Sequence, residues 1–389
     1  TIGGCRYYDE DAFVKMNEDF LIKNGRQLSL LCLNINGLPK KKDDFELLQE
    51  TLNYKFDILG FTETHMNGVS ENLATLGDYR WAANSRDCKN WGGVAVYVRP
   101  GLNFKRRTDM DIFDEGVFES IFVEIKDQSG SFIVGVIYRP PDSDIACFLI
   151  HLNSVLDKLR NKRSYLMGDF NLDLIKSENH SATGQFLGDM NSVGFHPLIA
   201  LPTRVTPKSA TLIDNIFTND ICRPISSGLV YTSISDHLPV FSILGGSERR
   251  IGAGSQFCLK RKMGVENLEK FRKWVKDWGM KVNIGTDTVV DDAIRFRNEL
   301  RDGYNVCFPQ KRVRVRNIDI RKPWLDDDSL KSKMKERNRL YALKLKGKYG
   351  LSNDNTEQLR LLTSEVSIFK RDLKKSYFAR RLDEAGKDS

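Results

Sequence analysis

The 389-residue sequence lacks any run of about 18 consecutive apolar residues, the length that a membrane-spanning helix requires. Its first ten residues, TIGGCRYYDE, contain no apolar stretch of the kind found in signal peptides, and the chain does not begin with Met. We therefore expect an intracellular protein that crosses no membrane. From the missing Met we also expect a piece cut from a longer polypeptide.

Cysteine and histidine are scarce, with seven Cys and five His in the chain. No two Cys form a C-x-x-C pair, and their odd number and wide spacing argue against a disulfide framework or a zinc site. Reduced thiols in a cytosolic or nuclear protein are the simplest interpretation. A polymerase signature of the Y-x-D-D kind is also missing, so we do not expect this chain to synthesise DNA.

Positive charge is concentrated in the last part of the chain. Residues 1–245 contain 25 Lys and Arg against 31 Asp and Glu, a net charge of −6, whereas residues 246–389 contain 35 against 21, a net charge of +14. A basic tail of this kind points to a polyanion such as nucleic acid. A solvated helical surface that is simply rich in Lys and Arg is an equally good interpretation of the composition.

Short apolar runs recur along the first 245 residues and are typical of buried strands. We expect strands at 28–35, 56–64, 92–99, 118–126, 131–138, 164–170, 211–219, 225–232 and 237–244. Apolar residues at helical spacing predict helices at 44–53, 145–160 and 181–194. Many strands with a few helices between them indicate an α/β protein with large, partly antiparallel sheets.

Composition divides the chain into four expected segments. They are an N-terminal extension (1–26), a main α/β domain (27–245), a basic linker region (246–320) and a helical hairpin (321–389). The linker region begins near GGSERRIGAGS, whose Gly and Ser content is typical of a loop, and contains an amphipathic helix at 266–279. We interpret the hairpin as a packing spacer rather than as a separate active site.

The strand that contains SYLMGDF ends in alternating polar residues, Asp169, Asn171 and Asp173. Alternate residues of an extended chain share one face, so these three side chains can point in the same direction. A calcium loop is excluded, because the sixth position is Leu174 instead of Gly and the twelfth is His180 instead of Glu. A solvated turn after a strand remains the alternative for this motif taken alone.

Four other apolar strands carry polar residues of the same kind, inside them or at an end: Asn34, Asn36, Glu63, Asp214, Asp236 and His237. Buried carboxylates are unfavourable unless they are paired, hydrogen-bonded or bound to a metal. Several of them meeting at one place would form a site for a hard cation, and oxygen ligands without Cys favour Mg²⁺ or Mn²⁺ over zinc. A His beside an Asp, with a second Asp elsewhere, is typical of an orienting pair for acid–base chemistry.

Six short motifs follow one another in a fixed order: N-x-N-G, T-E-T-H, Y-R-P-P, G-D-F-N, L-I-D-N and S-D-H-x-P. In this order they resemble the endonuclease/exonuclease/phosphatase superfamily, and more closely the apurinic-endonuclease-like domain of non-LTR (LINE-type) retrotransposons. The phrase PTRVTPKSATLIDNIFTN, residues 202–219, is especially similar to those elements. The resemblance covers residues 27–245. It implies a four-layer sandwich of two mixed β-sheets flanked by helices, followed by a basic α-helical C-terminal region.

The resemblance also implies a role for each motif residue. Those at the metal would be Glu63 as the direct carboxylate ligand, Asn34, Asn36 and Asp236. Asp169 would activate the attacking water, and Asn171 would hold that water or the phosphate. His237, oriented by Asp214, would stabilise the charged transition state. The phenol of Tyr138 and the hydroxyl of Thr211 would contact the phosphate.

Together these features predict a Mg²⁺-dependent endonuclease that nicks DNA and leaves a 3′-hydroxyl and a 5′-phosphate. In the family, this 3′ end primes reverse transcription. Arg204 and residues 105–107 are candidates for a local DNA-binding patch, and the basic C-terminal region is a candidate for binding DNA or element RNA. We expect a nuclear protein with a reverse transcriptase encoded downstream. The alternatives are an abasic-site repair endonuclease or phosphatase of the same superfamily, and a catalytically dead nucleic-acid-binding remnant.

Overall fold

The structure is a computed structural model that describes residues 4–24, 27–66, 74–86, 91–127, 130–206, 209–245, 257–261, 264–279, 289–314, 322–346 and 353–387. The chain forms two compact units, residues 1–251 with 321–389, and residues 252–320. The predicted linker at 245–255 lies outside the described residues, except for Gly245.

The larger unit contains a first sheet that has seven strands in the described part of the chain. In spatial order these are β1 (Arg6–Tyr8), β15 (Pro224–Val230), β16 (Val240–Leu244), β2 (Leu28–Asn34), β3 (Ile58–Thr62), β5 (Val94–Val98) and β4 (Arg80–Asn84). Every residue of β2, β3 and β5 is buried. Continuous apolar runs of this kind are expected for strands that are covered on both faces.

The second sheet of the larger unit also has seven strands in the described residues. They are β11 (His196–Pro197), β14 (Asp214–Thr218), β10 (Ser164–Asp169), β9 (Gly130–Tyr138), β8 (Phe118–Asp127) and β6 (Asn103–Arg106), with β7 (Phe113–Asp114) paired to β8. Strand β10 runs parallel to β9 and antiparallel to β14, so the sheet is mixed.

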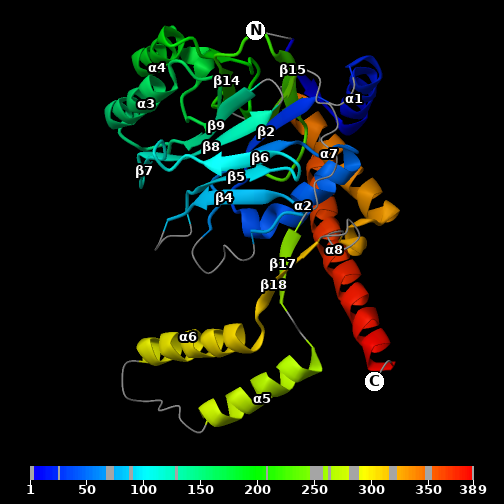
Figure 1. The fold of residues 1–389 in the computed structure, drawn as a ribbon. Helices are drawn as coiled ribbons and strands as arrows, with labels where there is room; N and C mark the ends of the chain where they lie inside the picture. Colours follow the sequence, from blue (N-terminus) through cyan, green and yellow to red (C-terminus); the bar gives the residue numbers. More distant parts are fainter. Residues whose placement is uncertain are drawn as a thin grey trace. The chain divides into compact units, whose positions relative to one another are not determined.

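The two sheets pack face to face around an apolar layer, and helices cover both outer faces (Figure 1). On the first sheet these are α1 (Glu10–Asn24), α2 (Leu38–Thr51), α7 (Asp328–Lys346) and α8 (Asn353–Lys387). On the second sheet they are α3 (Ile145–Leu159) and α4 (Ser181–Ser192). The predicted four-layer α/β sandwich with a helical C-terminal region is therefore confirmed.

Helix α3 illustrates how local sequence sets these elements. The carboxylate of Asp144 accepts hydrogen bonds from the backbone N–H groups of Ala146 and Cys147, which caps the helix at its first turn. Its buried residues recur at helical spacing: Phe148, Leu149, Leu152, Val155, Leu156 and Leu159. Burial of each large side chain stabilises the fold by about 1.5–3 kcal/mol.

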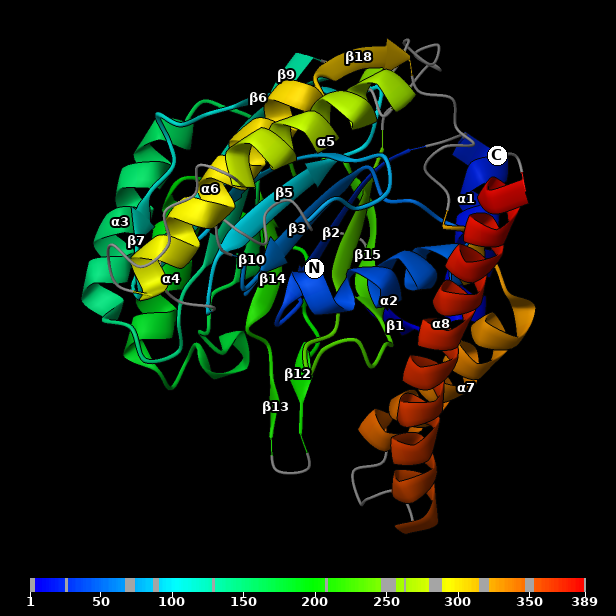
Figure 2. The ribbon, with the colours of Figure 1, turned by 90° about the horizontal axis from the view of Figure 1, so that it is seen from below.

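A short hairpin of β12 (Arg204–Val205) and β13 (Ala210–Thr211) projects away from the sheets (Figure 2). Among the helices of the described residues, none combines the length and the hydropathy that crossing a bilayer requires.

The smaller unit contains β17 (Phe257–Arg261), α5 (Val265–Gly279), α6 (Val289–Cys307) and β18 (Gln310–Arg314) in its described part. The two strands pair antiparallel, and aromatic side chains join the two helices. A side chain in place of Gly303 would not fit, because its Cβ would lie 2.2 Å from the indole ring of Trp274. The helix predicted at 266–279 is present as α5.

Candidate active site

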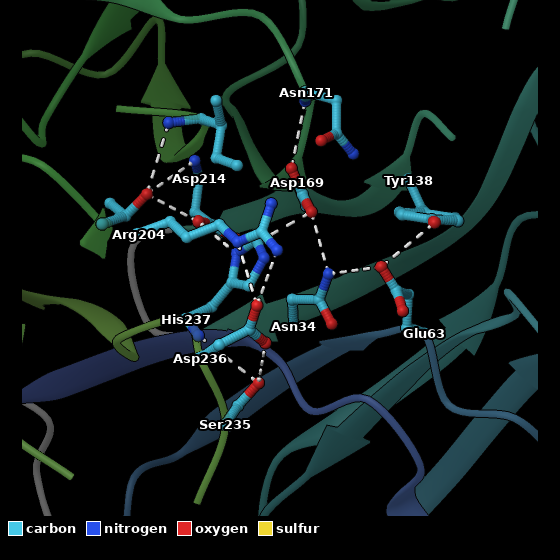
Figure 3. A network of polar contacts seen from close by, with 12 residues as sticks. Asn34, Glu63, Tyr138, Asp169, Asn171, Arg204, Asp214, Ser235, Asp236 and His237 are labelled. Atoms are coloured by element: carbon cyan, nitrogen blue, oxygen red, sulfur yellow. Dashed lines mark hydrogen bonds and ion pairs between the residues drawn. The ribbon is translucent and has the colours of Figure 1, made fainter. Parts of the chain in front are cut away.

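Polar residues from five strands meet at one edge of the two packed sheets (Figure 3). Asn34 ends β2, Tyr138 ends β9, Asp169 ends β10, and Asp214 begins β14. Asp169 is in register with Tyr138 on one side and with Asp214 on the other. Glu63 directly follows β3, the parallel neighbour of β2. The strand order thus gathers residues that are far apart in the sequence.

The side chain of Asn34 joins the two sheets at this edge. Its Nδ2 donates one hydrogen bond of 2.8 Å to Oε1 of Glu63 and another of 2.8 Å to Oδ2 of Asp169. Tyr138 donates a third hydrogen bond, of 3.1 Å, to the same Glu63 oxygen. Asn34 is only 1% exposed, so its two hydrogen bonds are shielded from water and strengthened by the low local dielectric.

Glu63 is ionised at neutral pH. Burial raises its pKa, but hydrogen bonds from His65, Asn34 and Tyr138 outweigh burial and lower the pKa to about 2. The backbone of Glu63 is left-handed, with a φ of 48°, a conformation that costs a residue with a Cβ roughly 1–2 kcal/mol. A 2.8 Å hydrogen bond from the N–H of Gly37 to the carbonyl of Glu63 helps to hold it.

Asp169, Asp214 and His237 form the buried centre of the site, and none of them is more than 4% exposed. Nδ1 of His237 lies 2.8 Å from Oδ2 of Asp214 and 3.9 Å from Oδ2 of Asp169. Burial and the adjacent Asp214 raise the pKa of Asp169 to about 7. Burial alone would lower the pKa of His237, but the two carboxylates raise it to about 9. The imidazole therefore keeps its proton at neutral pH, while Asp169 is close to its titration midpoint.

Thr203 fixes the orientation of Asp214, although sequence analysis assigned it no role. Its hydroxyl donates a hydrogen bond of 2.6 Å to Oδ2 of Asp214 and accepts one of 3.1 Å from the backbone N–H of Asp214. Thr203 lies in the phrase PTRVTPKSATLIDNIFTN, and the resemblance of this phrase to LINE-type elements is the sequence signal that could have identified it. Gly168 is equally constrained, because a Cβ there would lie 1.8 Å from the carbonyl oxygen of Ile137 on β9.

The loop after β10 is held by Arg139, a second residue without an assigned role, although it belongs to the Y-R-P-P motif. Its guanidinium donates a hydrogen bond of 3.0 Å to the carbonyl of Asn171, whose side-chain amide donates one of 2.8 Å to the carbonyl of Arg139. The backbone N–H of Asn171 donates a bond of 3.0 Å to Oδ1 of Asp169. Both oxygens of Asp169 thus accept a hydrogen bond, which fixes its carboxylate.

Oxygen atoms of Asn34 and Glu63 fit a hard divalent cation. Oδ1 of Asn34 is buried and has no hydrogen-bond partner among the described residues. A buried oxygen in this state is unfavourable unless a ligand binds it. It belongs to the amide that also bonds to the ionised Glu63, and amide and carboxylate oxygens are ligands that Mg²⁺ accepts.

A second group of ligand atoms lies close by. Atoms of Asp169, Asp214 and His237 are all within 4.8 Å of one another, which is compatible with a shared metal ion. However, Nδ1 of His237 and Oδ2 of Asp214 already bond to each other. We therefore favour Asn34 and Glu63 as the cation site.

The other predicted residues lie beside this network or outside it. Arg204 and Asp236 form an ion pair of 2.8 Å next to His237, and both side chains are more than 40% exposed (Figure 3). Asn36 is exposed, and no hydrogen bond of its side chain occurs within the part of the chain that the structure describes. The hydroxyl of Thr211 lies 3.4 Å from the carbonyl oxygen of Arg204, and the structure does not bring it into the network.

Two arginines of the predicted patch at 105–107 already bond to carboxylates of the chain. Arg106 pairs with Asp111 at 2.8 Å. Arg107 pairs with Asp109 at 2.7 Å and with Glu124 at 3.1 Å. These ion pairs reduce the availability of both guanidinium groups to DNA phosphates.

Comparison with known proteins gives one family match. Residues 31–237, more than half of the chain, match the family described as Endonuclease/Exonuclease/phosphatase family. This segment includes every member of the site described above. No curated protein matches the sequence.

Several solved structures are similar to the chain. The endonuclease domain of TRAS1, a telomere-specific non-LTR retrotransposon, shares 17% identity over 57% of this chain and 100% of that domain, with a TM-score of 0.47. AP endonuclease LMAP from Leishmania major shares 12% identity over 59% of this chain and 91% of that one, with a TM-score of 0.48. A 3′-5′ exonuclease from Neisseria meningitidis shares 18% identity over 56% and 100%, with a TM-score of 0.44.

Proposed function

Because the chain belongs to the endonuclease/exonuclease/phosphatase family, we propose that it is a Mg²⁺-dependent endonuclease that nicks DNA and leaves a 3′-hydroxyl and a 5′-phosphate. One observation carries the proposal. An ionised Glu63, an Asp169 with a pKa of about 7 and a protonated His237 meet at one edge of the two sheets. Such groups can assist phosphodiester hydrolysis, because the phosphate is negatively charged and gains more negative charge when water attacks it.

Asp169 is the proposed base. With its pKa raised to about 7, it can accept a proton from the attacking water at neutral pH. Its carboxylate is held by Asn34 and by the backbone N–H of Asn171, so the base has a fixed direction. A positioned base of this kind contributes on the order of 10²–10⁴-fold to the rate.

His237 is the proposed source of positive charge beside the base, with its Nδ1 3.9 Å from Oδ2 of Asp169. Its imidazolium, held by Asp214, offsets the negative charge that develops on the phosphate. We assign the phenol of Tyr138, which donates a hydrogen bond to Glu63, to a phosphate oxygen of the bound substrate. A cation bound by Asn34 and Glu63, with Mn²⁺ as a substitute for Mg²⁺, would supply further positive charge to the phosphate oxygens.

Four further predicted residues complete the proposal. We assign Asn36 and Asp236 to the metal side, and Arg204 and Thr211 on the projecting hairpin to contact with the DNA. The exposure of Asn36, Arg204 and Asp236 makes them accessible to a ligand.

We further propose a retrotransposon origin, with the nicked 3′ end priming reverse transcription in the nucleus. Support comes from the similarity of residues 202–219 to LINE-type elements and from the net charge of +14 in residues 246–389, which suits DNA or element RNA. A reverse transcriptase would then be encoded downstream of this chain.

The direct test is cleavage of a labelled duplex, with and without an abasic site, in Mg²⁺. We expect nicking of the intact duplex, with 3′ ends that a DNA polymerase extends and 5′ ends that a ligase seals. Cleavage at the abasic site alone, or release of inorganic phosphate alone, would replace the proposal by the repair or phosphatase alternative. Binding of the duplex without any cleavage would indicate a catalytically dead remnant.

A further inference from the structure

Helix α7 lies outside the residues that match the family, yet it packs against the loop that leads into His237. This loop, residues 231–236, connects β15 to the segment before β16. Figure 1 shows α7 beside α1 and α2, on the outer side of the first sheet. Leu330 and Met334 of α7 are fully buried in the apolar cluster that covers this sheet. The helix is therefore part of the larger unit.

Asn338 of α7 connects this loop to helix α1. Its Oδ1 accepts a hydrogen bond of 3.3 Å from the backbone N–H of Ser233. Its Nδ2 donates one of 2.7 Å to Oε1 of Glu10. Asn338 is only 1% exposed, so water cannot replace these partners, and the loss of one leaves a buried polar group unsatisfied.

The next turn of α7 continues the same contact. The hydroxyl of Tyr341 lies 3.5 Å from the carbonyl oxygen of Ser235, at the limit of hydrogen bonding. Ala342 is 5% exposed and belongs to the buried cluster that contains Leu238, the residue after His237. Positions 338, 341 and 342 share one face of a helix, so a single face of α7 contacts the loop and the residues next to it.

The side-chain hydrogen bonds within residues 232–237 are long, as is the 3.3 Å bond from Ser233 to Asn338, while shorter backbone bonds hold the two ends of the segment: 2.9 Å from the N–H of Tyr231 to the carbonyl of Tyr8, and 2.8 Å from the N–H of Leu238 to the carbonyl of Thr203. The N–H of Ile234 lies 3.4 Å from the hydroxyl of Thr232, and the N–H of His237 lies 3.4 Å from the hydroxyl of Ser235. Both distances exceed those of a strong N–H···O bond. The position of the loop therefore depends on the elements packed against it, and α7 is one of them.

We propose that Asn338 is a positioning residue of the active site, which holds the loop 231–236 and thereby keeps His237 in place for phosphodiester hydrolysis. This role rests on the proposed nuclease function. Asn338 itself touches no reacting group and acts through Ser233. The active site is thus completed by a helix that lies outside the matched segment at 31–237.

The test uses the full chain and four variants: Asn338→Ala, Asn338→Asp, the double variant Glu10→Gln/Asn338→Asp, and Arg339→Ala as a control. Arg339 is the neighbouring residue on α7, is 59% exposed and pairs with Glu336 on the same helix. We expect Asn338→Ala to lower kcat for nicking by roughly tenfold, because a misplaced group slows the chemical step. The KM for DNA should change less than about twofold, because Asn338 does not contact substrate.

The double variant separates positioning from a general folding defect. Asn338→Asp places a carboxylate opposite the carboxylate of Glu10, so we expect its kcat to fall as well. Adding Glu10→Gln should restore kcat to near the wild-type value. The amide introduced at position 10 can donate to the carboxylate introduced at position 338, which still accepts from Ser233.

Hydrogen exchange gives a readout that does not depend on catalysis. We expect the amides of residues 232–237 to exchange faster in Asn338→Ala than in wild type, and at the wild-type rate in Arg339→Ala. Wild-type kcat and exchange in both single Asn338 variants would overturn the positioning role. A wild-type chain that fails to nick, with faster exchange in Asn338→Ala, would instead refute the nuclease function and leave the role of Asn338 in holding the loop intact.

Discussion

At the scale of single residues, the geometry of the site depends on Asn34. Its amide bonds to Glu63 of the first sheet and to Asp169 of the second, while its carbonyl oxygen stays free for a ligand. An Asp at this position would lose the two donated hydrogen bonds and add a carboxylate beside those of Glu63, Asp169 and Asp214. The amide thus supplies two donors to acidic partners and a neutral acceptor for a cation.

Replacement of the proposed base separates catalysis from stability. We expect Asp169→Asn to reduce nicking by on the order of 10²-fold or more, because an amide cannot accept the proton of water. The free energy of unfolding of the metal-free protein should stay within about 1 kcal/mol of wild type, because one lost hydrogen bond is offset by removal of a buried carboxylate next to Asp214. Single-turnover nicking and urea unfolding measure both quantities. Wild-type nicking would refute the assignment of the base.

The ion pair between His237 and Asp214 should make stability depend on pH. The pKa of His237 is raised from 6.5 to about 9 in the folded state, so its contribution to stability is complete below pH 6.5 and is lost as the pH rises through about 9. Repulsion between Asp214 and Asp169 also lowers the stability of the wild type as the pH rises, because this repulsion grows as Asp169 ionises. The difference in unfolding free energy between wild type and Asp214→Asn should therefore shrink over this range. Urea unfolding of metal-free protein at several pH values tests this, and a constant difference would contradict it.

The order of the motifs predicted which residues meet at the sheet edge, because the motif residues lie at or near strand ends and the strand ends come together there. Motif spacing does not determine side-chain hydrogen bonds. Arg139, in the Y-R-P-P motif, and Thr203, in the phrase at 202–219, therefore received no role. Asn36 and Thr211 are the opposite case, because they received roles that no contact among the described residues supports. Their side chains lie outside the hydrogen-bond network of the site. Their roles come from the resemblance alone and stay predictions.

At the scale of elements, α7 and α8 are bound to the outer helices of the first sheet by ion pairs. Lys322, in the segment that leads to α7, lies 2.7 Å from Asp43 and 2.6 Å from Glu46, both on α2. Lys370 of α8 lies 2.8 Å from Asp44. Partly buried ion pairs such as these mainly specify where the hairpin docks, while the apolar side chains beneath them supply most of the stabilisation.

A pair of Leu→Ala changes on α7 tests how much the packing of this helix contributes to the stability of the larger unit. Leu330 is fully buried, so we expect Leu330→Ala to lower the free energy of unfolding of the larger unit by about 2–5 kcal/mol. Leu343 is 39% exposed on the same helix, and Leu343→Ala should cost less than about 1 kcal/mol. Urea unfolding followed by circular dichroism provides both values. If the sheets unfolded independently of α7, Leu330→Ala would leave their transition unchanged.

Sequence periodicity predicted most strands of the two sheets, because their apolar runs are continuous and bounded by polar residues. It missed the start of α2, which begins at Leu38 within a Lys-rich stretch instead of at residue 44. It could not predict the docking of α7, since Asn338 and Glu10 are separated by 328 positions and only the folded chain brings them together.

At the scale of the whole molecule, charge is divided between an acidic portion that contains the site and a basic portion downstream. The net charge is −6 for residues 1–245 and +14 for residues 246–389. A positive segment raises the local concentration of a polyanion and speeds its association. In the proposed function, the basic portion therefore holds the DNA while hydrolysis takes place at the sheet edge.

Helix α5 offers a test of this division, since four of its basic residues are exposed: Lys270, Arg272, Lys273 and Lys276. We expect their joint replacement by Gln to weaken DNA binding and to flatten the dependence of log Kd on log salt. Each lost phosphate contact should reduce the slope by about 0.9. Binding titrations at several KCl concentrations measure the slope, and a slope equal to that of wild type would exclude contact between α5 and the phosphates.

The most direct measurement for the central claim is nicking of a supercoiled plasmid by the wild-type chain in Mg²⁺, in EDTA, and by Asp169→Asn in Mg²⁺. The site geometry predicts conversion to open circles by the wild type in Mg²⁺, no conversion in EDTA, and a loss of on the order of 10²-fold in the variant. Equal conversion by the wild type and Asp169→Asn, or conversion that persists in EDTA, would contradict the account.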